Sequence, residues 1–450
     1  MTQDDLKKYS VVIDEGSGCL FQPMTEDYTY ILTVNHLFFD KVKDEQGQKH
    51  NIQKENGTEI KIRKNVKQGD LWILETIPFV LSLHENYFPH ENADAAILKI
   101  PYQEGFNMIT VQEDFEEADG YALCGFPSVN RDNMDGEWYR RNEIQNFSAS
   151  GNYSRGAQLK GNLSQHDIEG MSGCGILKLN QEGISIIGLQ SKMASRQFPA
   201  GGIGFVPSRY SAEIIAYGKY AEKLEKLYPN TLANFSFLSD KAFLLEVDNM
   251  DLQNAQDARI TLLNKAQNII DSDITPYGIK ELFKERLLIS KTDNFCLTFN
   301  SIWIAWLEFL TIMNIVKDEN IKNADLSDIF NSYRLKYVNV DDWTDTDVRK
   351  EYGKSDYLGM QANSTVFISS KNPAKTSFKI PHGTLIDVSR PYNKSGFQTT
   401  EGLDPFTSFD FVHIDYFKTK CIVHKIEEYK NLSEEQIIAK LKDEYNGLFQ

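Results

Sequence analysis

The chain has 450 residues, of which 41% are hydrophobic and 25% are charged, and its formal net charge is −16. This length and apolar content predict a globular protein of two or three domains with their own cores. The acidic balance disfavours direct, uniform binding of nucleic acid, because binders of phosphate backbones are normally basic.

The cysteines and the apolar segments exclude several further classes. The five cysteines are scattered and lack the Cys-x-x-Cys spacing of zinc sites: Cys19, Cys124, Cys174, Cys296 and Cys421. The first ten residues have no apolar core of a secretory signal, and the apolar stretch 302–316 is too short to span a bilayer. We therefore expect a cytoplasmic protein with no metal, no cofactor and no membrane insertion.

Residues 11 to about 208 read as all-β, because short runs of Val, Ile, Phe and Tyr alternate with Gly, Asn and Asp turns. Regular short strands of this kind predict a sandwich or a pair of barrels. The polar stretch 39–54 is expected to be an exposed hairpin or loop, and 130–146 a second polar loop. The expected strands are 11–13, 30–34, 59–63, 71–76, 95–100, 121–125, 175–179, 184–189 and 204–206.

The pattern becomes helical after Pro207, with apolar residues spaced three and four apart. The segment 363–388 returns to a β-like or irregular pattern, and Ser433 is placed as the N-cap of a final helix. We therefore expect one domain over 1–210 and a mainly α domain, with α+β as the alternative, over 211–450. The expected helices are 210–227, 255–270, 279–288, 299–316 and 433–445.

Three residues in chain order predict nucleophilic catalysis. His36 ends the run Ile-Leu-Thr-Val-Asn-His, Asp94 begins Asp-Ala-Ala-Ile-Leu-Lys-Ile, and Ser172 lies within Gly-Met-Ser-Gly-Cys-Gly. A serine hydroxyl is a weak nucleophile and needs a base to take its proton, which His36 would supply. Asp94 would hold the imidazole in one tautomer, and the backbone N–H groups of Gly170 and Ser172 would form an oxyanion hole.

These segments resemble the landmarks of the trypsin-like serine proteases and are most similar to the bacterial HtrA-like (Deg-type) branch. The resemblance covers roughly residues 10–210 and implies two six-stranded β-barrels, with the active site in the cleft between them. It implies that the first barrel carries His36 and Asp94 and the second carries Ser172. The segments that carry it are 16–20, 31–36, 94–99, 125–127, 170–173, 186–188 and 202–207.

The sequence departs from that family around the nucleophile. Met171 stands where Asn or Asp is usual, Cys174 replaces a glycine and Gly175 replaces a proline. No PDZ-like segment follows the protease-like region. Cys174 could be redox-sensitive, or it could be a small buried residue.

By the same resemblance, the pocket for the substrate side chain before the scissile bond (P1) would be lined by His166, Gln190, Gly202 and Gly204. Asp167 would favour a basic P1 residue and His166 an acidic one. Spacing alone does not choose between them.

The second half contains no Walker A motif, no Gly-x-Gly-x-x-Gly and no Cys/His cluster. The arrangement resembles the protease effectors of bacterial anti-phage systems of the Lamassu-like or ABC three-component kind. The resemblance implies that residues 211–450 form an adaptor that docks on an ABC- or SMC-type ATPase sensor. The chain would then be a regulated serine endopeptidase acting on a protein substrate within a defence complex.

Other interpretations stay open. The protease fold could be a catalytically inactive interaction module, or the chain could cleave itself. Taken alone, His36 and Asp94 also fit structural residues at strand ends. The acidic residues near Trp343 fit a solvated turn, and His413 and His424 fit ordinary structural histidines.

Overall fold

The computed structural model describes most of the chain as two compact units, Met1–Asn230 and Thr231–Gln450. The described residues are 3–44, 46, 48–106, 109–112, 120–128, 139–149, 151–161, 163–180, 183–193, 202–216, 220–247, 252–340, 343, 359–360, 364–374, 377–380 and 409–449. Helix α2 (Arg209–Ala216) packs on strands β9 (Ala96–Pro101) and β16 (Gly202–Pro207), so it belongs with the first unit.

The first unit opens with a seven-stranded antiparallel sheet in the order β7-β6-β1-β2-β3-β9-β8. In register, Cys19 of β2 faces Leu32 of β3, and Thr33 of β3 faces Ala96 of β9. The ends of β3 and β9 therefore lie side by side. The strands are β1 (Ser10–Ile13), β2 (Gly16–Phe21), β3 (Tyr28–Thr33), β6 (Ile62–Gln68), β7 (Leu71–Ile77), β8 (Tyr87–Pro89) and β9 (Ala96–Pro101).

The second sheet of this unit closes into a six-stranded barrel. Its order is β15-β14-β11-β12-β13-β16, β16 pairs back with β15, and β10 joins the outer side of β15 in parallel. Closure removes the free edges that an open sheet exposes. The strands are β10 (Ile109–Val111), β11 (Tyr121–Gly125), β12 (Arg140–Ala149), β13 (Arg155–Leu159), β14 (Gly175–Asn180), β15 (Gly183–Met193) and β16 (Gly202–Pro207).

Two apolar cores hold the first unit together. One is shared by the two sheets and includes Phe21 and Ile97 of the first sheet with Leu189 of the barrel. The other fills the barrel and includes Ile187 and Phe205. The nucleophile segment between α1 (Gln165–Ile168) and β14 is anchored in the barrel core, because Met171 and Cys174 pack into it.

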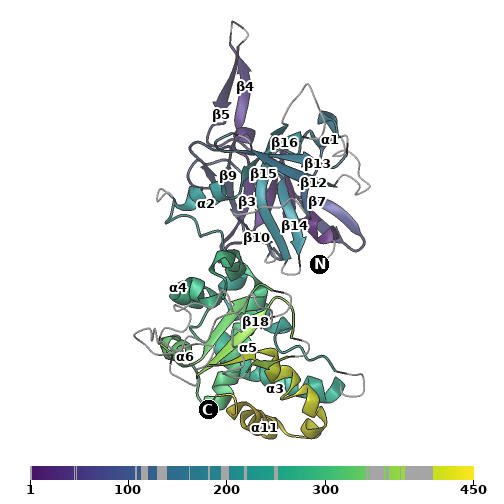
Figure 1. Ribbon diagram of the computed structural model, residues 1–450. Coiled ribbons are helices and arrows are strands. Elements are labelled where there is room, and N and C mark those ends of the chain that lie inside the picture. The colour runs from purple at the N-terminus through teal and green to yellow at the C-terminus, as the bar shows by residue number, and fades with distance from the viewer. Residues whose placement is uncertain are drawn as a thin grey trace. The chain divides into compact units, whose positions relative to one another are not determined.

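A two-stranded hairpin of β4 (Phe39–Lys43) and β5 (Lys49–Gln53) projects from the first unit (Figure 1). It follows the short 3-10 helix η2 (Asn35–Phe38), which carries His36. A further 3-10 helix, η1 (Gln3–Tyr9), precedes β1. Of the two forms predicted for 39–54, an exposed hairpin or a loop, the structure has the hairpin.

The second unit is built around α5 (Asn300–Lys317), which is buried on almost all sides. A helix that is apolar all round belongs in a core, and this one packs against β17 and β18 and against α3. The other helices are α3 (Leu252–Ile270), α4 (Pro276–Phe283), α6 (Leu326–Ser332), α10 (Asp415–Thr419) and α11 (Glu434–Asn446). The 3-10 helices are η4 (Asn230–Leu232), η5 (Phe235–Lys241), η7 (Lys284–Leu287), η8 (Lys291–Thr298), η9 (Asn323–Asp325) and η10 (Val423–Tyr429).

The second unit also contains a four-stranded sheet in the order β17-β18-β20-β19. The strands β17 (Arg334–Val338), β18 (Thr365–Ser370) and β20 (Asp410–His413) are parallel, and β19 (Lys379–Ile380) is antiparallel to β20. Because parallel strands end at one edge, Ser370 and His413 come close together there.

The strand predictions at 11–13, 71–76, 121–125 and 184–189 are confirmed, as are the helices at 255–270, 299–316 and 433–445. The polar loop predicted over 130–146 is wrong for 140–146, which lie in β12, and residues 130–138 lie outside the described part. Strand β12 forms because β11 and β13 supply hydrogen-bond partners on both sides, which outweighs its polar composition. The predicted helix 210–227 is confirmed only over α2. The acidic residues 341–342, 345 and 347 lie outside the described residues.

All five cysteines are buried, and they form no disulfide. Within the described ranges, no group of three or more His, Cys, Asp or Glu side chains is placed to hold a metal ion. The described helices include none that is both long enough and apolar enough to cross a membrane.

Candidate active site

His36, Asp94 and Ser172 line one cleft of the first unit, with a volume of about 1140 Å³. His36 lies on η2 directly after β3, and Asp94 precedes β9, the neighbouring strand. Ser172 comes from the segment before β14 of the barrel. The two sheets thus contribute different members of the predicted triad to the same cleft.

Asp94 makes two hydrogen bonds to His36. Its Oδ2 lies 2.8 Å from His36 Nδ1, and its Oδ1 accepts the backbone N–H of His36 at 2.8 Å. Because an ionised carboxylate only accepts, the proton of the neutral imidazole lies on Nδ1. Nε2 is then left with its lone pair, which is the form a general base requires.

A second histidine holds the loop that leads to Asp94. His90 is buried, and its Nδ1 accepts the backbone N–H groups of Asn92 at 3.0 Å and Ala93 at 2.8 Å. Its Nε2 lies 3.2 Å from Glu213 Oε2 on α2. His90 was not predicted from the sequence. The signal available in the sequence was its position four residues before Asp94, in a short loop whose backbone N–H groups need a side-chain acceptor.

Two successive turns shape the segment around Ser172. In the first, Met171 N–H donates to Ile168 O at 3.1 Å, Glu169 has φ −58° and ψ 135°, and Gly170 has φ +85°. This is a type II turn, which requires a positive φ at its third residue and therefore favours glycine. In the second, Cys174 N–H donates to Met171 O at 2.8 Å, and Gly173 at the third position has φ +92°. Ser172 is the second residue of this turn.

Strand β2 of the other sheet braces these turns. Ser17 N–H donates to Ser172 O at 2.7 Å, and Ser17 Oγ donates to Gly170 O at 3.0 Å. Gly173 packs directly on this contact, because a Cβ at residue 173 would lie 1.9 Å from Ser17 O. Only glycine satisfies both the backbone conformation and the space here.

A hydrogen bond from Ser128 also fixes the peptide between Glu169 and Gly170. Ser128 N–H donates to Glu169 O at 2.6 Å. Because the peptide is trans, fixing the Glu169 carbonyl toward Ser128 turns the Gly170 N–H in the opposite direction. The orientation of one predicted oxyanion donor therefore depends on the residue that follows the Gly-Phe-Pro segment.

The residues predicted to line the P1 pocket lie in different environments. Gln190 is buried and lines the cleft. His166 is exposed on α1 and, like Gly202 and Gly204 of β16, is not among the residues that line the cleft. The Lys192 side chain lies over Gly204, since a Cβ at residue 204 would be 3.0 Å from Lys192 Cγ. The pocket roles of His166, Gly202 and Gly204 stay predictions.

Asp167, considered for a basic P1 residue, is engaged locally. Its Oδ2 accepts the N–H and the hydroxyl of Ser164, both at 2.6 Å, at the start of α1. These hydrogen bonds hold the pKa of the Asp167 carboxyl below its usual range. The carboxylate therefore acts as a helix cap.

Cys174 is fully buried behind the nucleophile. A Cβ at Gly125 would lie 1.8 Å from Cys174 Sγ, so the thiol occupies the space that this glycine leaves. Burial raises the pKa of the nearby Cys124 thiol to about 12 and raises that of Cys19 further. This packing favours the interpretation of Cys174 as a small buried residue rather than a reactive one.

Residues 205–423 match the family model of C-terminal domain 4 of the ABC-three component (ABC-3C) systems. The second half of the chain therefore carries a domain of a kind found in these systems. No curated protein is similar to this chain. Among solved structures it is similar to catalytically active tobacco etch virus protease complexed with product, with 13% identity and a TM-score of 0.29, over 46% of this chain and 76% of that chain. A TM-score this low carries no argument about the site.

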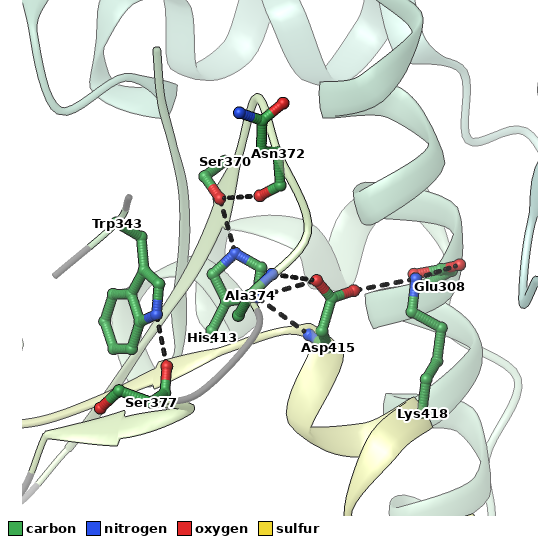
Figure 2. Close-up of polar contacts among 9 residues, drawn as sticks. All are labelled: Glu308, Trp343, Ser370, Asn372, Ala374, Ser377, His413, Asp415 and Lys418. Atoms are coloured by element: carbon green, nitrogen blue, oxygen red, sulfur yellow. Dashed lines mark hydrogen bonds and ion pairs between the residues drawn. The ribbon is translucent and has the colours of Figure 1, made fainter. Parts of the chain in front are cut away.

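The second unit also contains a Ser, a His and an Asp, which are in contact with one another at the edge where the parallel strands end (Figure 2). His413 Nε2 lies 2.8 Å from Ser370 Oγ, and His413 Nδ1 lies 3.3 Å from Asp415 Oδ2. Ser370 Oγ, however, donates its single hydrogen to Asn372 O at 2.6 Å. His413 Nε2 must then donate to Ser370, so it cannot act as the base for this serine. The prediction of a structural role for His413 agrees with this geometry.

This cluster continues into a buried ion network that ties α10 to α5 (Figure 2). Lys418 Nζ lies 3.0 Å from Asp415 Oδ1 and 3.1 Å from Glu308 Oε2, and Glu308 is only 2% exposed. Burial lowers the pKa of Lys418, but the two carboxylates outweigh this and hold the pKa above its ordinary value. The lysine therefore stays charged and forms an ion pair with each of the two carboxylates in the interior.

We expect Gly173→Ala to destabilise the first unit more than Gly161→Ala does. Gly161 has φ +91°, and no atom lies within 4 Å of the position that a Cβ would take there. Gly161→Ala therefore measures the cost of backbone strain alone, about 1–2 kcal/mol of unfolding free energy. Gly173→Ala adds the overlap with Ser17 O, a further ~1–3 kcal/mol. Guanidinium unfolding of both variants measures the difference. Equal losses of unfolding free energy would show that there is room for a methyl group at residue 173 beside β2.

We expect Lys418→Met to lower the free energy of unfolding by about 3–5 kcal/mol, because it leaves Glu308 and Asp415 buried without a counter-charge. The control is Lys442→Met, which breaks a surface pair with Asp318 at 3.3 Å and is expected to cost at most ~1 kcal/mol. Guanidinium unfolding followed by tryptophan fluorescence reports this, since Trp303 and Trp306 lie in the core of the second unit. A loss no larger than that of the control would contradict the network's role.

Proposed function

We propose that the chain is a serine endopeptidase of the trypsin-like, HtrA-related kind, with two barrels and with His36, Asp94 and Ser172 as its triad. The observation that carries the proposal is the two-point hydrogen bond of Asp94 to His36 on the cleft that Ser172 also lines. An aspartate in this arrangement fixes the imidazole tautomer and stabilises the imidazolium.

In this mechanism Ser172 Oγ attacks the scissile carbonyl while His36 Nε2 takes its proton. The tetrahedral intermediate collapses when His36 returns the proton to the leaving amine, and an acyl-enzyme on Ser172 remains. A water molecule, deprotonated by His36, then attacks the acyl carbon, and the bond to Ser172 breaks as His36 returns the proton to Ser172 Oγ and the acid product leaves. Asp94 stays ionised throughout and holds the imidazole in place.

The backbone N–H groups of Gly170 and Ser172 would stabilise the oxyanion in both steps. The contacts that support this assignment are the two turns with glycine at the third position and the bonds from Ser17 and Ser128. Donors held by the surrounding backbone need no reorganisation when charge develops, which is the source of their catalytic effect.

We further propose that residues 211–450 act as an adaptor and that the chain is the effector of a bacterial defence complex. The match of residues 205–423 to a domain of ABC-three component systems supports this role. The partner would be an ABC- or SMC-type ATPase sensor, and the substrate a protein in the cytoplasm. Holding the peptidase inactive until assembly would protect the host's own proteins.

Two other functions compete with this proposal. An inactive protease-fold module would keep the fold without a reactive serine, and a self-cleaving protein would use its own chain as the substrate. Fragmentation of the purified wild-type chain that is absent in Ser172→Ala would identify self-cleavage.

We expect a fluorophosphonate probe to label the wild-type chain at Ser172, with loss of fluoride, and not to label Ser172→Ala. His36→Ala should abolish labelling at the same probe concentration, and Asp94→Asn should slow it by about 10⁴-fold, because the amide stabilises the wrong tautomer. Intact mass spectrometry of samples taken at successive times measures the labelling of the wild type and the three variants.

The result can be separated from a folding defect by comparing the thermal unfolding of each variant with that of the wild type. Labelling that survives Ser172→Ala would contradict the assignment. Labelling that appears only when the partner components are added would indicate a latent enzyme, and none in either condition would favour the inactive module.

We expect Ser128→Pro to lower kcat about 10²–10³-fold with little change in KM, since it removes the N–H that orients the Glu169–Gly170 peptide. Ser128→Ala keeps this N–H and is the matched control, with kcat near that of the wild type. Steady-state hydrolysis of a peptide substrate measures both. Similar kcat values for the two variants would show that this hydrogen bond does not set the oxyanion donor.

A further inference from the structure

The side chain of Gln190 is a buried amide with an unmet hydrogen-bonding atom. Gln190 is 3% exposed, and its Oε1 is buried without a hydrogen-bond partner. Buried polar groups normally find partners, and an isolated one lowers stability. A substrate group that reached this buried oxygen would supply the missing partner.

Gln190 lies directly beside the nucleophile. Its backbone N–H donates to Cys174 O at 2.9 Å, and its carbonyl accepts Gly173 N–H at 2.7 Å. These two bonds join β15 to the turn that carries Ser172, and Gln190 and Ser172 line the same cleft. A substrate whose scissile carbonyl reaches Ser172 would have the adjoining side chain close to this residue.

The wall around the Gln190 amide is uncharged. Gln190 pairs with Phe205 across β15 and β16, so the two side chains lie on the same face, and Phe205 packs in the barrel core. Ile168, which also lines the cleft, is buried and packs in the same core as Phe205. The charged cleft residues Glu169 and Lys192 are exposed. The buried residues of this wall thus offer the Gln190 amide, the Ser191 hydroxyl, which donates to Gly204 O, and apolar atoms, with no counter-charge.

We propose that Gln190 determines P1 specificity and that the site selects a P1 carboxamide, the side chain of Gln or Asn. This inference rests on the proposed peptidase function and deepens it. A carboxamide donates an N–H to the Gln190 oxygen and accepts from its NH₂, so both amides are satisfied whichever way the Gln190 amide is turned.

The other P1 classes fit this wall less well. A carboxylate or an ammonium would be buried against a neutral amide without a counter-charge, which is costly. An apolar P1 side chain would leave the Gln190 oxygen without a partner in the complex. A site built to hydrogen-bond its substrate rejects an analogue without that group far more strongly than an apolar pocket rejects a polar one.

The test is a P1 series on the full-length chain, using fluorogenic peptides that share P4–P2 and carry Gln, Asn, Leu, Glu or Lys at P1. For the wild type we expect kcat/KM for P1 Gln to exceed that for P1 Leu by about 10²-fold or more. Gln190→Met keeps the size of the side chain and removes the amide, and it should lower the Gln-to-Leu ratio to about 1 or below. Lys160→Met changes an exposed residue outside the cleft and should leave the ratio unchanged.

The inference is overturned by a wild-type preference for a charged or apolar P1 residue, or by a Gln190→Met variant that keeps the wild-type ratio. Fluorophosphonate labelling of the same preparations separates these outcomes from failure of the proposed function. Labelled enzyme with another P1 preference overturns the role of Gln190 alone. A chain that neither labels nor cleaves any peptide in a Ser172-dependent way overturns both.

Discussion

The contact between Ser17 of β2 and the turn around Ser172 is the constraint on which the cleft of the first unit depends. One residue donates through its N–H to Ser172 O and through its hydroxyl to Gly170 O, so both carbonyls of the turn point toward β2. Thr33 Oγ1 in turn donates to Ser17 O at 2.7 Å, next to the strand end that leads to His36. The strands that place the base and the turn that places the nucleophile are therefore linked by a short chain of hydrogen bonds across the two sheets.

The polar groups around the cleft differ in whether the protein satisfies them. The carbonyls of Gly170, Ser172 and Glu169 all accept hydrogen bonds, and both carboxylate oxygens of Asp94 are used. These bonds fix the orientation of the groups that would do chemistry, at no cost during the reaction. Gln190 is different, since its amide is buried with its oxygen unmet. A polar group whose hydrogen bonds are made within the protein fixes the geometry of the site. A group with an unmet hydrogen-bonding atom discriminates among ligands instead, and the cleft contains both kinds.

The strands and helices that could be predicted from the sequence are those determined by interactions between residues close together in the chain. Strands with alternating or continuous apolar runs, such as 95–100 and 184–189, and the apolar helix 299–316 were predictable, because their burial is visible in composition. Strand β17 was missed because Arg334 and Lys336 are fully buried in it, and Lys336 Nζ donates to Leu288 O at 3.1 Å, a tertiary contact that no local pattern reports. Strand β12 was missed because its pairing with β11 and β13 is also a tertiary interaction, which its polar composition does not reveal. The roles of His90, Ser17 and Ser128 also depend on partners far along the chain or on loop geometry.

The two Ser-His-Asp clusters show why residue types in proximity do not define a catalytic site. In both, a histidine ring nitrogen lies near a carboxylate, at 2.8 Å from Asp94 for His36 and at 3.3 Å from Asp415 for His413. At His36 the carboxylate accepts a hydrogen bond from Nδ1–H and leaves the Nε2 lone pair to accept a proton, in a cleft open to substrate. At His413 the hydroxyl of Ser370 is already committed to Asn372 O, so the direction of proton donation runs from the histidine to the serine. The direction of donation, which follows from counting hydrogens on each group, therefore separates a site able to activate a serine from a network that joins β18, β20 and α10.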